Sequence, residues 1–381
     1  MFQWDGLPAV HKPLDSGAAV GGGAAASIAA KLARAPLPRV EPASTADPAP
    51  GALPRRHFAP RFGAPVAALD LGTNNCRLLV ARPTGIGFRV IDAFSRIVRL
   101  GEGVAATGAL SADAIARTLD ALKVCADKIA FRRVANGRFV ATEACRRASN
   151  CEEFLAQVRA ETGLVIETIS TAEEARLVVS GCAPLLNPRI PYAVVFDIGG
   201  GSTEIVLVRL EGGRERHCRH PRILGSMSLP LGVVTLTDRF GGEVSPATYR
   251  MMVEEAAASL AAFERSWRIR RHIRTGRMQM LGSSGTVTTL AGIHLALPRY
   301  IRALVDGSSL TFDQIAAVSA HLAGLDLAGR AASPCVGRER ADLVLSGCAI
   351  LDAICETWPV GRLRVADRGV REGILFDLIQ G

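Results

Sequence analysis

The sequence predicts an α/β protein built from two related domains. Two stretches, LDLGTNNCRLLV (69–80) and FDIGGGSTEIVLV (196–208), each place an aspartate and a turn between two apolar runs. Short apolar runs rich in β-branched or aliphatic residues and bounded by turn residues favour strands, so each stretch predicts a strand–turn–strand unit. The two aspartates, Asp70 and Asp197, lie 127 residues apart (197 − 70). A repeat at this domain-sized spacing predicts a duplicated α/β architecture.

The turns of both stretches predict a site for a phosphate. Glycines in such turns admit positive φ angles and let the backbone approach a ligand closely. Successive backbone N–H groups then form an anion nest, to which Ser and Thr hydroxyls add donors. Two such hairpins facing each other would hold an anion from both sides of a cleft. The predicted phosphate-binding residues of the hairpins are Asp70, Gly72, Thr73, Asn74, Gly199, Gly200, Gly201, Ser202 and Thr203.

The carboxylates of Asp197 and Glu204 flank the glycine-rich turn, where they would repel a bare anion. They suit the turn if a divalent cation or a positioned water lies between them and a phosphate, and carboxylate oxygens are good ligands for such cations. Both residues are therefore predicted metal ligands, and Mg²⁺ or another divalent cation is the predicted cofactor.

Two other interpretations of the glycine-rich turn are available. A dinucleotide-binding fingerprint requires a third glycine three residues after the second, followed by a helix. Position 204 is Glu and a strand-like run follows it, so this interpretation is rejected. An ordinary β-hairpin with a glycine-rich turn is the simpler alternative, and the second copy of the pattern at Asp70 argues against it.

Further blocks accompany the two hairpins in a fixed order. They are ATEACRRASN (141–150), ISTAEEARLVVSG (169–181), SMSLPLGVVTLTDRF (226–240), LGSSGTVTTLAG (281–292), ERADLVLSGCAIL (339–351) and VADRGVREGIL (365–375). With the hairpins, they resemble the exopolyphosphatase / guanosine pentaphosphate phosphatase family, within the actin-like ATPase and sugar-kinase superfold. The resemblance runs from about residue 65 to the C-terminus.

The resemblance implies two actin-like (ribonuclease H-like) domains with an interdomain cleft. Domain I is expected over 65–178, completed by a C-terminal helix over 365–381, and domain II over 179–364. Residues 1–64 combine Gly, Ala and Pro without periodicity, which predicts a disordered tail. Longer family members carry an additional helical domain, so a composite substrate groove here would need a homodimer or a shorter binding tract.

The block at 169–181 supplies the predicted catalytic residue. Ser170 or Thr171 is a candidate N-cap, and a capping box with Glu173 or Glu174 would explain both glutamates structurally. The resemblance implies instead that Glu174 is the general base that aligns the attacking water, with Glu173 left as the capping partner. Thr171 departs from the family pattern, which usually has glycine there.

Two other blocks supply predicted phosphate ligands. Arg146 matches a family arginine that faces the phosphates, and its planar fork suits them; a solvent-facing helix arginine is the alternative. Glu143 departs from the family pattern, where a small hydroxyl residue is common. Gly285 and Thr286 can present N–H groups at a helix N-terminus, and the alternative is a simple Gly-Ser helix entry.

The composition agrees with a cytoplasmic enzyme that acts on a polyanion. The formal net charge is +9, which suits such a substrate without identifying it, and no specific nucleic-acid partner is expected. No run of about 18 apolar residues occurs, so no membrane span is expected. The nine cysteines form no CxxC pair, which favours reduced thiols. The HCRH sequence (217–220) is predicted to be a solvated loop rather than a zinc site.

The predicted function is that of an exopolyphosphatase, which releases orthophosphate from the end of inorganic polyphosphate by attack of water. Hydrolysis of the 5′-phosphate of guanosine pentaphosphate is the first alternative, because the motifs do not separate the two substrates. A phosphotransferase that uses ATP is a weaker one. A non-catalytic sensor that binds polyphosphate or an alarmone is the alternative from another class, and Glu174 argues against it, since a binder needs no base.

Overall fold

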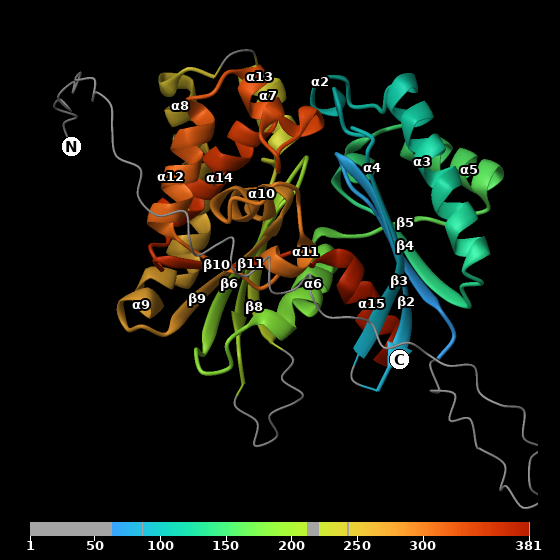
Figure 1. Cartoon of the computed structure of the whole chain (residues 1–381), viewed down its shortest axis with the longest axis horizontal. Coiled ribbons are helices and arrows are strands. Elements are labelled where there is room, and N and C mark those ends of the chain that lie inside the picture. Colours follow the sequence, from blue (N-terminus) through green and yellow to red (C-terminus); the bar gives the residue numbers. More distant parts are fainter. Residues whose placement is uncertain (1–62, 86, 212–220, 242–243, 381) are drawn as a thin grey trace, which may run out of the picture. The chain divides into compact units, whose positions relative to one another are not determined.

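The computed structural model describes residues 63–85, 87–211, 221–241 and 244–380. The predicted tail over 1–64 lies almost entirely outside the described residues, and so does the HCRH sequence. The described residues fall within one compact unit, Pro60–Gly381. Figure 1 shows two β-sheets with helices on their outer sides and two helices between them.

The first sheet has five strands in the order β3-β2-β1-β4-β5. They are β1 (Val66–Leu71), β2 (Asn75–Thr84), β3 (Gly87–Ile97), β4 (Asn136–Ala141) and β5 (Glu167–Thr168). The first three strands are antiparallel neighbours, whereas β4 runs parallel to β1 and β5 runs parallel to β4. The hairpin that contains Asp70 therefore lies at the centre of this sheet.

The second sheet has six strands in the order β10-β11-β9-β6-β7-β8. They are β6 (Tyr192–Ile198), β7 (Thr203–Arg209), β8 (Arg222–Leu229), β9 (Met278–Ser284), β10 (Ser309–Thr311) and β11 (Arg362–Ala366). The strands β8-β7-β6-β9-β11 repeat the order and the directions of β3-β2-β1-β4-β5. The predicted duplication is confirmed by this repeated topology.

Helices cover the outer faces of both sheets. The described helices are α2 (Val104–Thr107), α3 (Ala112–Phe131), α4 (Glu143–Arg147), α5 (Cys151–Thr162), α6 (Thr171–Cys182), α7 (Val233–Phe240), α8 (Pro246–Trp267), α9 (Ile269–Arg274), α10 (Gly285–His294), α11 (Arg302–Val305), α12 (Phe312–Ala323), α13 (Leu327–Ala332), α14 (Val344–Thr357) and α15 (Val370–Gln380). In Figure 1, α3 and α5 lie outside the first sheet, and α8, α12 and α14 lie outside the second. No described helix is long and apolar enough to cross a bilayer.

The helices α6 and α15 fill the layer between the two sheets (Figure 1). One buried cluster joins Leu79 of the first sheet, Val206 of the second, Leu177 of α6 and Ile374 of α15. Burying apolar surface from both sheets in one layer holds them together.

Glycines bring α6 and α15 into backbone contact. A Cβ added to Gly181 of α6 would lie 2.1 Å from the carbonyl oxygen of Gly369, and one added to Gly373 of α15 would lie 2.1 Å from that of Leu177. Neither position can hold a larger residue unless the helices separate.

The predicted domain boundaries fall inside elements of the structure. The boundary at 178/179 lies within α6, the helix that packs between the sheets. The expected C-terminal helix begins at Val370 rather than at 365, because Val365 and Ala366 pair with β9 in the second sheet. The division of the chain into domains I and II stays a prediction.

Candidate functional site

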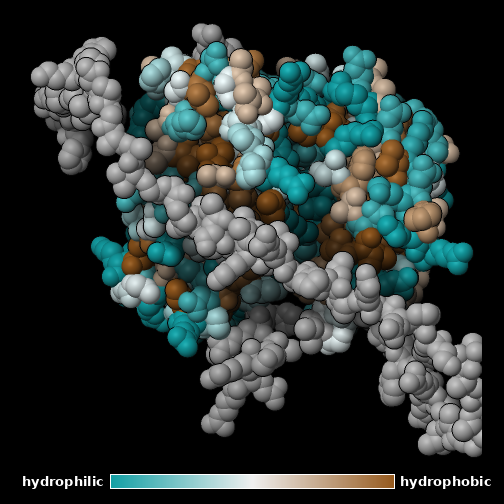
Figure 2. Space-filling view, viewed as in Figure 1, coloured by the Kyte–Doolittle hydropathy of each residue, from teal (hydrophilic) through white to brown (hydrophobic). Residues whose placement is uncertain are grey.

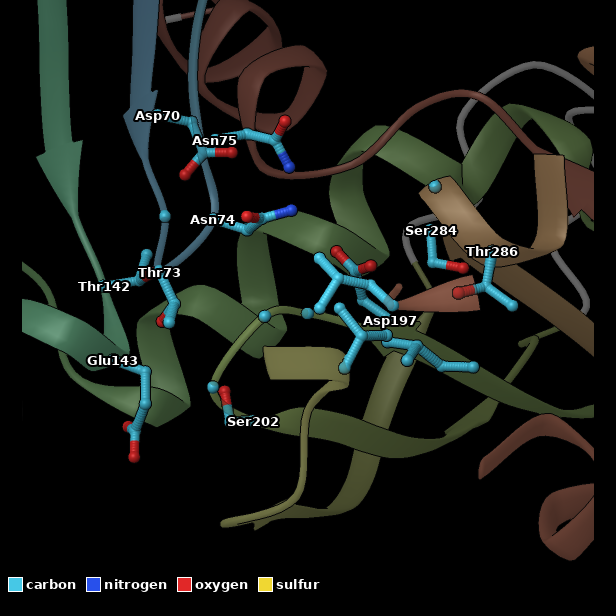
Figure 3. A pocket seen from close by; sticks show the side chains of 18 of the residues that line it. Asp70, Thr73, Asn74, Asn75, Thr142, Glu143, Asp197, Ser202, Ser284 and Thr286 are labelled. Atoms are coloured by element: carbon cyan, nitrogen blue, oxygen red, sulfur yellow. The ribbon is translucent and has the colours of Figure 1, made fainter. Parts of the chain in front are cut away.

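A cavity lies where the two hairpins meet (Figure 3). Every predicted site residue lines it except Arg146 and Thr203. The structure thus brings together Asp70, Gly72, Thr73, Asn74, Glu174, Asp197, Gly199, Gly200, Gly201, Ser202, Glu204, Gly285 and Thr286.

The two hairpins close in the same way. The N–H of Gly72 donates to the carbonyl oxygen of Asn75 at 2.9 Å, and the N–H of Gly199 donates to that of Ser202 at 2.9 Å. Gly199, Gly200 and Gly201 do not have φ angles in the left-handed region, which corrects the expected use of these glycines. Their role is close approach: a Cβ on Gly201 would lie 2.7 Å from the Thr73 hydroxyl across the cleft.

The carbonyls of the first turn are held from outside the cavity. The N–H of Gly101 donates to Thr73 O at 2.9 Å, and the N–H of Val98 donates to Asn74 O at 2.9 Å. The N–H groups of Thr73 and Asn74 donate to no backbone carbonyl of the described residues. Because the carbonyls of the turn are hydrogen-bonded to other segments, its two free N–H donors remain available for a ligand.

The N-terminus of α7 holds the second turn in the same manner. Val233 N–H donates to Gly199 O at 3.0 Å, and Val234 N–H donates to Gly200 O at 2.8 Å. Within the described part of the chain, the N–H groups of Gly200 and Gly201 also donate to no backbone carbonyl. Both turns therefore present free N–H donors, as an anion nest requires.

Asparagine side chains add polar groups to the same cavity. The Oδ1 atoms of Asn74 and Asn75 are buried and have no hydrogen-bond partner among the described residues. Figure 3 shows the Asn74 amide extending towards the side of the cavity formed by Asp197 and Ser284. Buried amides without partners lose hydrogen-bonding energy unless a ligand or water meets them.

Asp197 and Glu204 are opposite each other in the β6–β7 register, which puts both side chains on one face of the sheet. Both line the cavity. Burial raises the pKa of Asp197 to about 7. Burial also raises the pKa of Glu204, against the hydroxyls of Ser202 (2.7 Å) and Ser228 (3.0 Å), which donate to its Oε1. The pKa of Asp70 is raised by burial as well.

Glu174 lies in the first turn of α6, where the Ser170 side chain is the N-cap. The residue is only 8 % exposed, and its carboxylate accepts a hydrogen bond from Arg146 Nη1 at 2.8 Å. Burial, and then the nearby charge of Glu204, raise the pKa of Glu174 well above its usual range, while Arg146 opposes the rise.

Glu173 points to a different place from Glu174. Its carboxylate binds Arg176 and Arg138, and Arg176 in particular lowers the pKa of Glu173 to about 2. Ser170 accepts from the N–H of Glu173, but no return bond from the Glu173 side chain completes the expected capping box. Glu173 thus forms ion pairs with two arginines, whereas Glu174 is a buried residue of the cavity wall.

A match to the sequence profile of the Ppx/GppA phosphatase family covers residues 79–380. The chain belongs to this family. It is 32% identical, over 336 residues, to a protein named Exopolyphosphatase 2 from Mycobacterium tuberculosis, with 82% of this chain and 98% of the relative covered. It is also 32% identical, over 315 residues, to the Guanosine-5'-triphosphate,3'-diphosphate pyrophosphatase of Aeromonas hydrophila, with 82% of this chain and 59% of the relative covered.

A crystal structure of a Ppx/GppA family member from Aquifex aeolicus is similar to this chain at 30% identity and a TM-score of 0.66. The similarity covers 83% of this chain and 98% of that one. The chain therefore has the two actin-like domains and the interdomain cleft expected of a Ppx/GppA phosphatase.

Two predicted phosphate ligands of this Ppx/GppA chain lie elsewhere. Thr203 is fully buried, and its hydroxyl donates to the carbonyl of Leu231 at 2.6 Å, so it does not reach the cavity. Arg146 is bound by the carboxylates of Glu143 and Glu174, and it does not line the cavity. The Thr203 side chain is therefore not a phosphate ligand, which corrects that prediction, whereas the phosphate-binding role of Arg146 stays a prediction.

The residues at the N-terminus of α10 lie at the cavity, as the sequence predicted. The Ser284 side chain caps α10 and accepts from Val287 N–H at 2.9 Å. Gly285 and Thr286 follow in the first turn and line the cavity, and Figure 3 shows Ser284 and Thr286 on the wall opposite Asn74. The expected helix N-terminus is therefore in place at the cavity.

Three arginines, Arg77, Arg340 and Arg371, were not among the predicted site residues. Arg77 and Arg340 line the cavity, and all three line a second cavity that also shares Asp70 and Asp197 with the first. None of them belongs to an ion pair of the described residues. Burial lowers the pKa of Arg340 and of Arg371. Partly buried guanidinium groups without an ion-pair partner favour an anionic ligand.

The repeat itself contains a signal for Arg77. Arg77 follows Asp70 by seven residues, as Glu204 follows Asp197 (77 − 70 = 204 − 197). In both hairpins the two residues are register partners, Asp70 with Arg77 and Asp197 with Glu204. The counterpart of the predicted metal ligand Glu204 is thus a cation.

The acidic residues of the cavity have the donor chemistry of a Mg²⁺ site. Asp70, Asp197 and Glu204 are carboxyls without an ion-pair partner among the described residues. No group of three or more His, Cys, Asp or Glu in the described residues is close enough to hold a metal unaided. Mg²⁺ commonly takes one or two carboxylates plus water and substrate phosphates, so a pair such as Asp197 and Glu204 fits it.

Proposed function

We propose that this chain is an exopolyphosphatase, which hydrolyses the terminal phosphoanhydride of inorganic polyphosphate and releases orthophosphate. The observation that carries the proposal is the convergence of two turns with free N–H donors on one cavity that also contains the buried Glu174. The name of the Mycobacterium tuberculosis relative supports polyphosphate as the substrate.

The terminal phosphate would lie between the two hairpins. The N–H groups of Thr73 and Asn74 on one side, and of Gly200 and Gly201 on the other, would hold its oxygens. Fixed dipoles of this kind stabilise the charge of the transferring phosphoryl group without having to reorganise.

Glu174 would orient the attacking water and accept its proton. Its raised pKa makes the carboxylate a stronger base than an ordinary glutamate, and a base is most effective when its pKa lies near the working pH. Arg146 opposes the rise and keeps part of the population ionised. Water is the acceptor, so no covalent intermediate is required.

Asp197 and Glu204 would hold Mg²⁺ together with oxygens of the substrate. When bound, the ion would neutralise charge on the phosphates during transfer. The raised pKa values of both carboxyls mean that binding the ion competes with binding protons.

Guanosine pentaphosphate is the second candidate substrate. The name of the Aeromonas hydrophila relative favours it. The second cavity has in its lining Arg371, which belongs to no ion pair of the described residues, and so offers positive charge for a substrate larger than a terminal phosphate. Both substrates end in a phosphoanhydride, so the chemistry at Glu174 would be the same.

The decisive experiment measures phosphate release by the purified chain from polyphosphate and from guanosine pentaphosphate, in parallel and with Mg²⁺. We expect turnover of polyphosphate, and a fall in kcat of about 100-fold or more in Glu174→Gln, the usual scale for a lost acid/base group. Glu173→Gln is the matched control, since its carboxylate pairs with Arg138 and Arg176 instead.

Each other outcome has a distinct meaning. Faster release from guanosine pentaphosphate would overturn the choice of substrate. Tight binding of polyphosphate without release in the presence of Mg²⁺ would identify a sensor, and phosphorylation of an acceptor by ATP would identify a phosphotransferase. Normal turnover in Glu174→Gln would remove Glu174 from the mechanism.

We also propose that the enzyme works in the cytoplasm. The eight described cysteines are all free and buried, which supports a reducing compartment. The homodimer stays a prediction, and sedimentation of the purified chain tests it.

A further inference from the structure

The guanidinium of Arg146 lies between two carboxylates. Its Nε and Nη2 donate to Glu143 Oε2 at 3.2 and 2.9 Å. Its Nη1 donates to Glu174 Oε2 at 2.8 Å and to the carbonyl of Ile169 at 3.0 Å. The three charged side chains are only 10–15% exposed, so the ion pairs are shielded from solvent.

Every nitrogen of Arg146 is engaged in this arrangement. Two nitrogens bind Glu143, and the third binds Glu174 and Ile169. Glu143 itself belongs to the wall of the cavity, and in Figure 3 its carboxylate points away from Asp197 and Ser284. Glu143 therefore lies in the cavity wall with its carboxylate directed to Arg146.

We propose that Glu143 is a positioning residue, which fixes Arg146 on Glu174 and thereby keeps the Glu174 carboxylate oriented and ionised for the attack of water. The inference rests on the proposed function, because it concerns the base of that reaction. It gives a role to a residue at which this chain departs from the family pattern.

The geometry explains why Arg146 needs Glu143 as a partner in addition to Glu174. Glu143 and Arg146 are three residues apart on α4, a helix of only five residues, whereas Glu174 belongs to α6. Without Glu143, two nitrogens of Arg146 would lose their acceptor close to a cavity that binds phosphates. An arginine fork pairs strongly with phosphate oxygens, so Arg146 would turn to the substrate and leave Glu174.

Loss of Arg146 would remove the opposite charge that favours ionisation of Glu174. The other charged groups that act on it are Glu204 of β7 and Asp70 of β1, and it interacts in turn with Asp197 of β6. All three carboxylates oppose ionisation of Glu174. Glu174 would then ionise at higher pH, and the acid limb of the activity profile would move upwards.

The test combines Glu143→Ala with Glu174→Gln and measures kcat, KM and the pH dependence of kcat/KM on polyphosphate. In the wild-type background, we expect Glu143→Ala to lower kcat about 10-fold, within the range for an impaired base, and to move the acid limb to higher pH. KM should stay the same or fall, since Arg146 is freed for phosphate. Glu143→Gln should recover most of kcat, because its amide oxygen still accepts from Arg146.

In the Glu174→Gln background, Glu143→Ala should change kcat by less than about twofold, because residues that act through one another are not additive. A fall by the same factor in both backgrounds, or an unmoved acid limb, would overturn the proposal. Glu143→Ser gives the same comparison with a small polar residue if Glu143→Ala does not fold.

Glu173→Ala is the matched control for loss of an arginine-bound carboxylate next to the site. Its partners are Arg138 and Arg176, so the acid limb should stay where it is. Failure of the proposed function looks different: the wild-type chain itself would then release no phosphate from polyphosphate, whichever residue occupies position 143.

Discussion

Gly200 of the second hairpin packs directly against Asn74 of the first. A Cβ added to Gly200 would lie 3.0 Å from both the Cβ and the backbone nitrogen of Asn74. Gly200 is held there by α7, whose residue Val234 donates to its carbonyl at 2.8 Å. The distance between the two anion nests is therefore set by contact between the two turns, with no room for a side chain. Figure 2 shows one outer face of the molecule, on which hydrophilic and hydrophobic residues are interspersed.

The variant Gly200→Ala should impair catalysis more than folding. The added methyl must push the hairpins apart by a few tenths of an ångström, and misplacement of groups around a reacting phosphate is costly. We expect kcat/KM on polyphosphate to fall about 10-fold or more. Gly85→Ala is the control, because nothing lies within 4 Å of its added Cβ. Equal activity of the two variants would contradict the role of the contact.

The free energy of unfolding of the metal-free protein should fall as the pH rises from about 5 to 8. The folded-state pKa of Asp197, about 7, lies above its ordinary value of 3.8. The folded state therefore binds the extra proton in this interval, and the stability present below pH 4 is lost as the pH rises through 7. Burial of Glu174 and Glu204 acts in the same direction.

Urea denaturation in EDTA measures this dependence. Asp197→Asn removes one of the titrating groups, so its slope of stability against pH should be shallower than that of the wild type. Asp120→Asn, at an exposed position on α3, should keep the wild-type slope. A wild-type stability that rises over this interval would contradict the raised pKa values.

The variant Glu204→Gln should weaken the dependence of activity on Mg²⁺. The amide oxygen of the substituted side chain would still accept hydrogen bonds from Ser202 and Ser228, but the amide lacks the charge that attracts a cation. We expect the half-activating Mg²⁺ concentration to rise about 10-fold, because the site would lose one of its few carboxylate ligands. Asp352→Asn is the control, a buried carboxyl bound to Tyr249 and Ser319 instead. An unchanged Mg²⁺ titration would exclude Glu204 as a ligand.

The variant Arg340→Ala should raise KM for polyphosphate and leave kcat within about threefold, as expected when an interaction is made equally in ground and transition states. Arg340 lines both cavities without an ion-pair partner among the described residues. Arg338→Ala is the neighbouring control, since Arg338 is exposed and lines neither of these cavities. A fall in kcat with constant KM would mean that Arg340 acts at the reacting phosphoryl group.

The sequence was most informative where structure is local. Each hairpin is a continuous strand–turn–strand unit, so the aspartate, the turn and the second strand could be recognised together. The first-turn position of Glu174 followed likewise from the Ser170 cap. Recognising these features requires only residues that are close in the sequence. The repeat of the hairpin pattern then supported the predicted duplication.

The wrong prediction for Thr203 and the site residues that the sequence analysis missed both have physical reasons. Thr203 and Glu204 are consecutive on a strand, so their side chains point to opposite faces and could not both reach the cavity; this was foreseeable. The pairing of Arg146 with Glu174 was not foreseeable, because Glu174 reaches Arg146 from another helix. Arg340 and Arg371 come from distant segments that only the complete fold brings beside Asp70.

The glycine contact between α6 and α15 has a mechanical consequence. At Gly181 and Gly373 the helices meet through main-chain atoms, while Leu177 and Ile374 are packed in the core that the two sheets share. We expect this crossing to be the fixed point of any rotation between the two sheets. The hairpins lie away from it at the strand ends, where a small rotation becomes a larger displacement that can admit a chain or let a product leave.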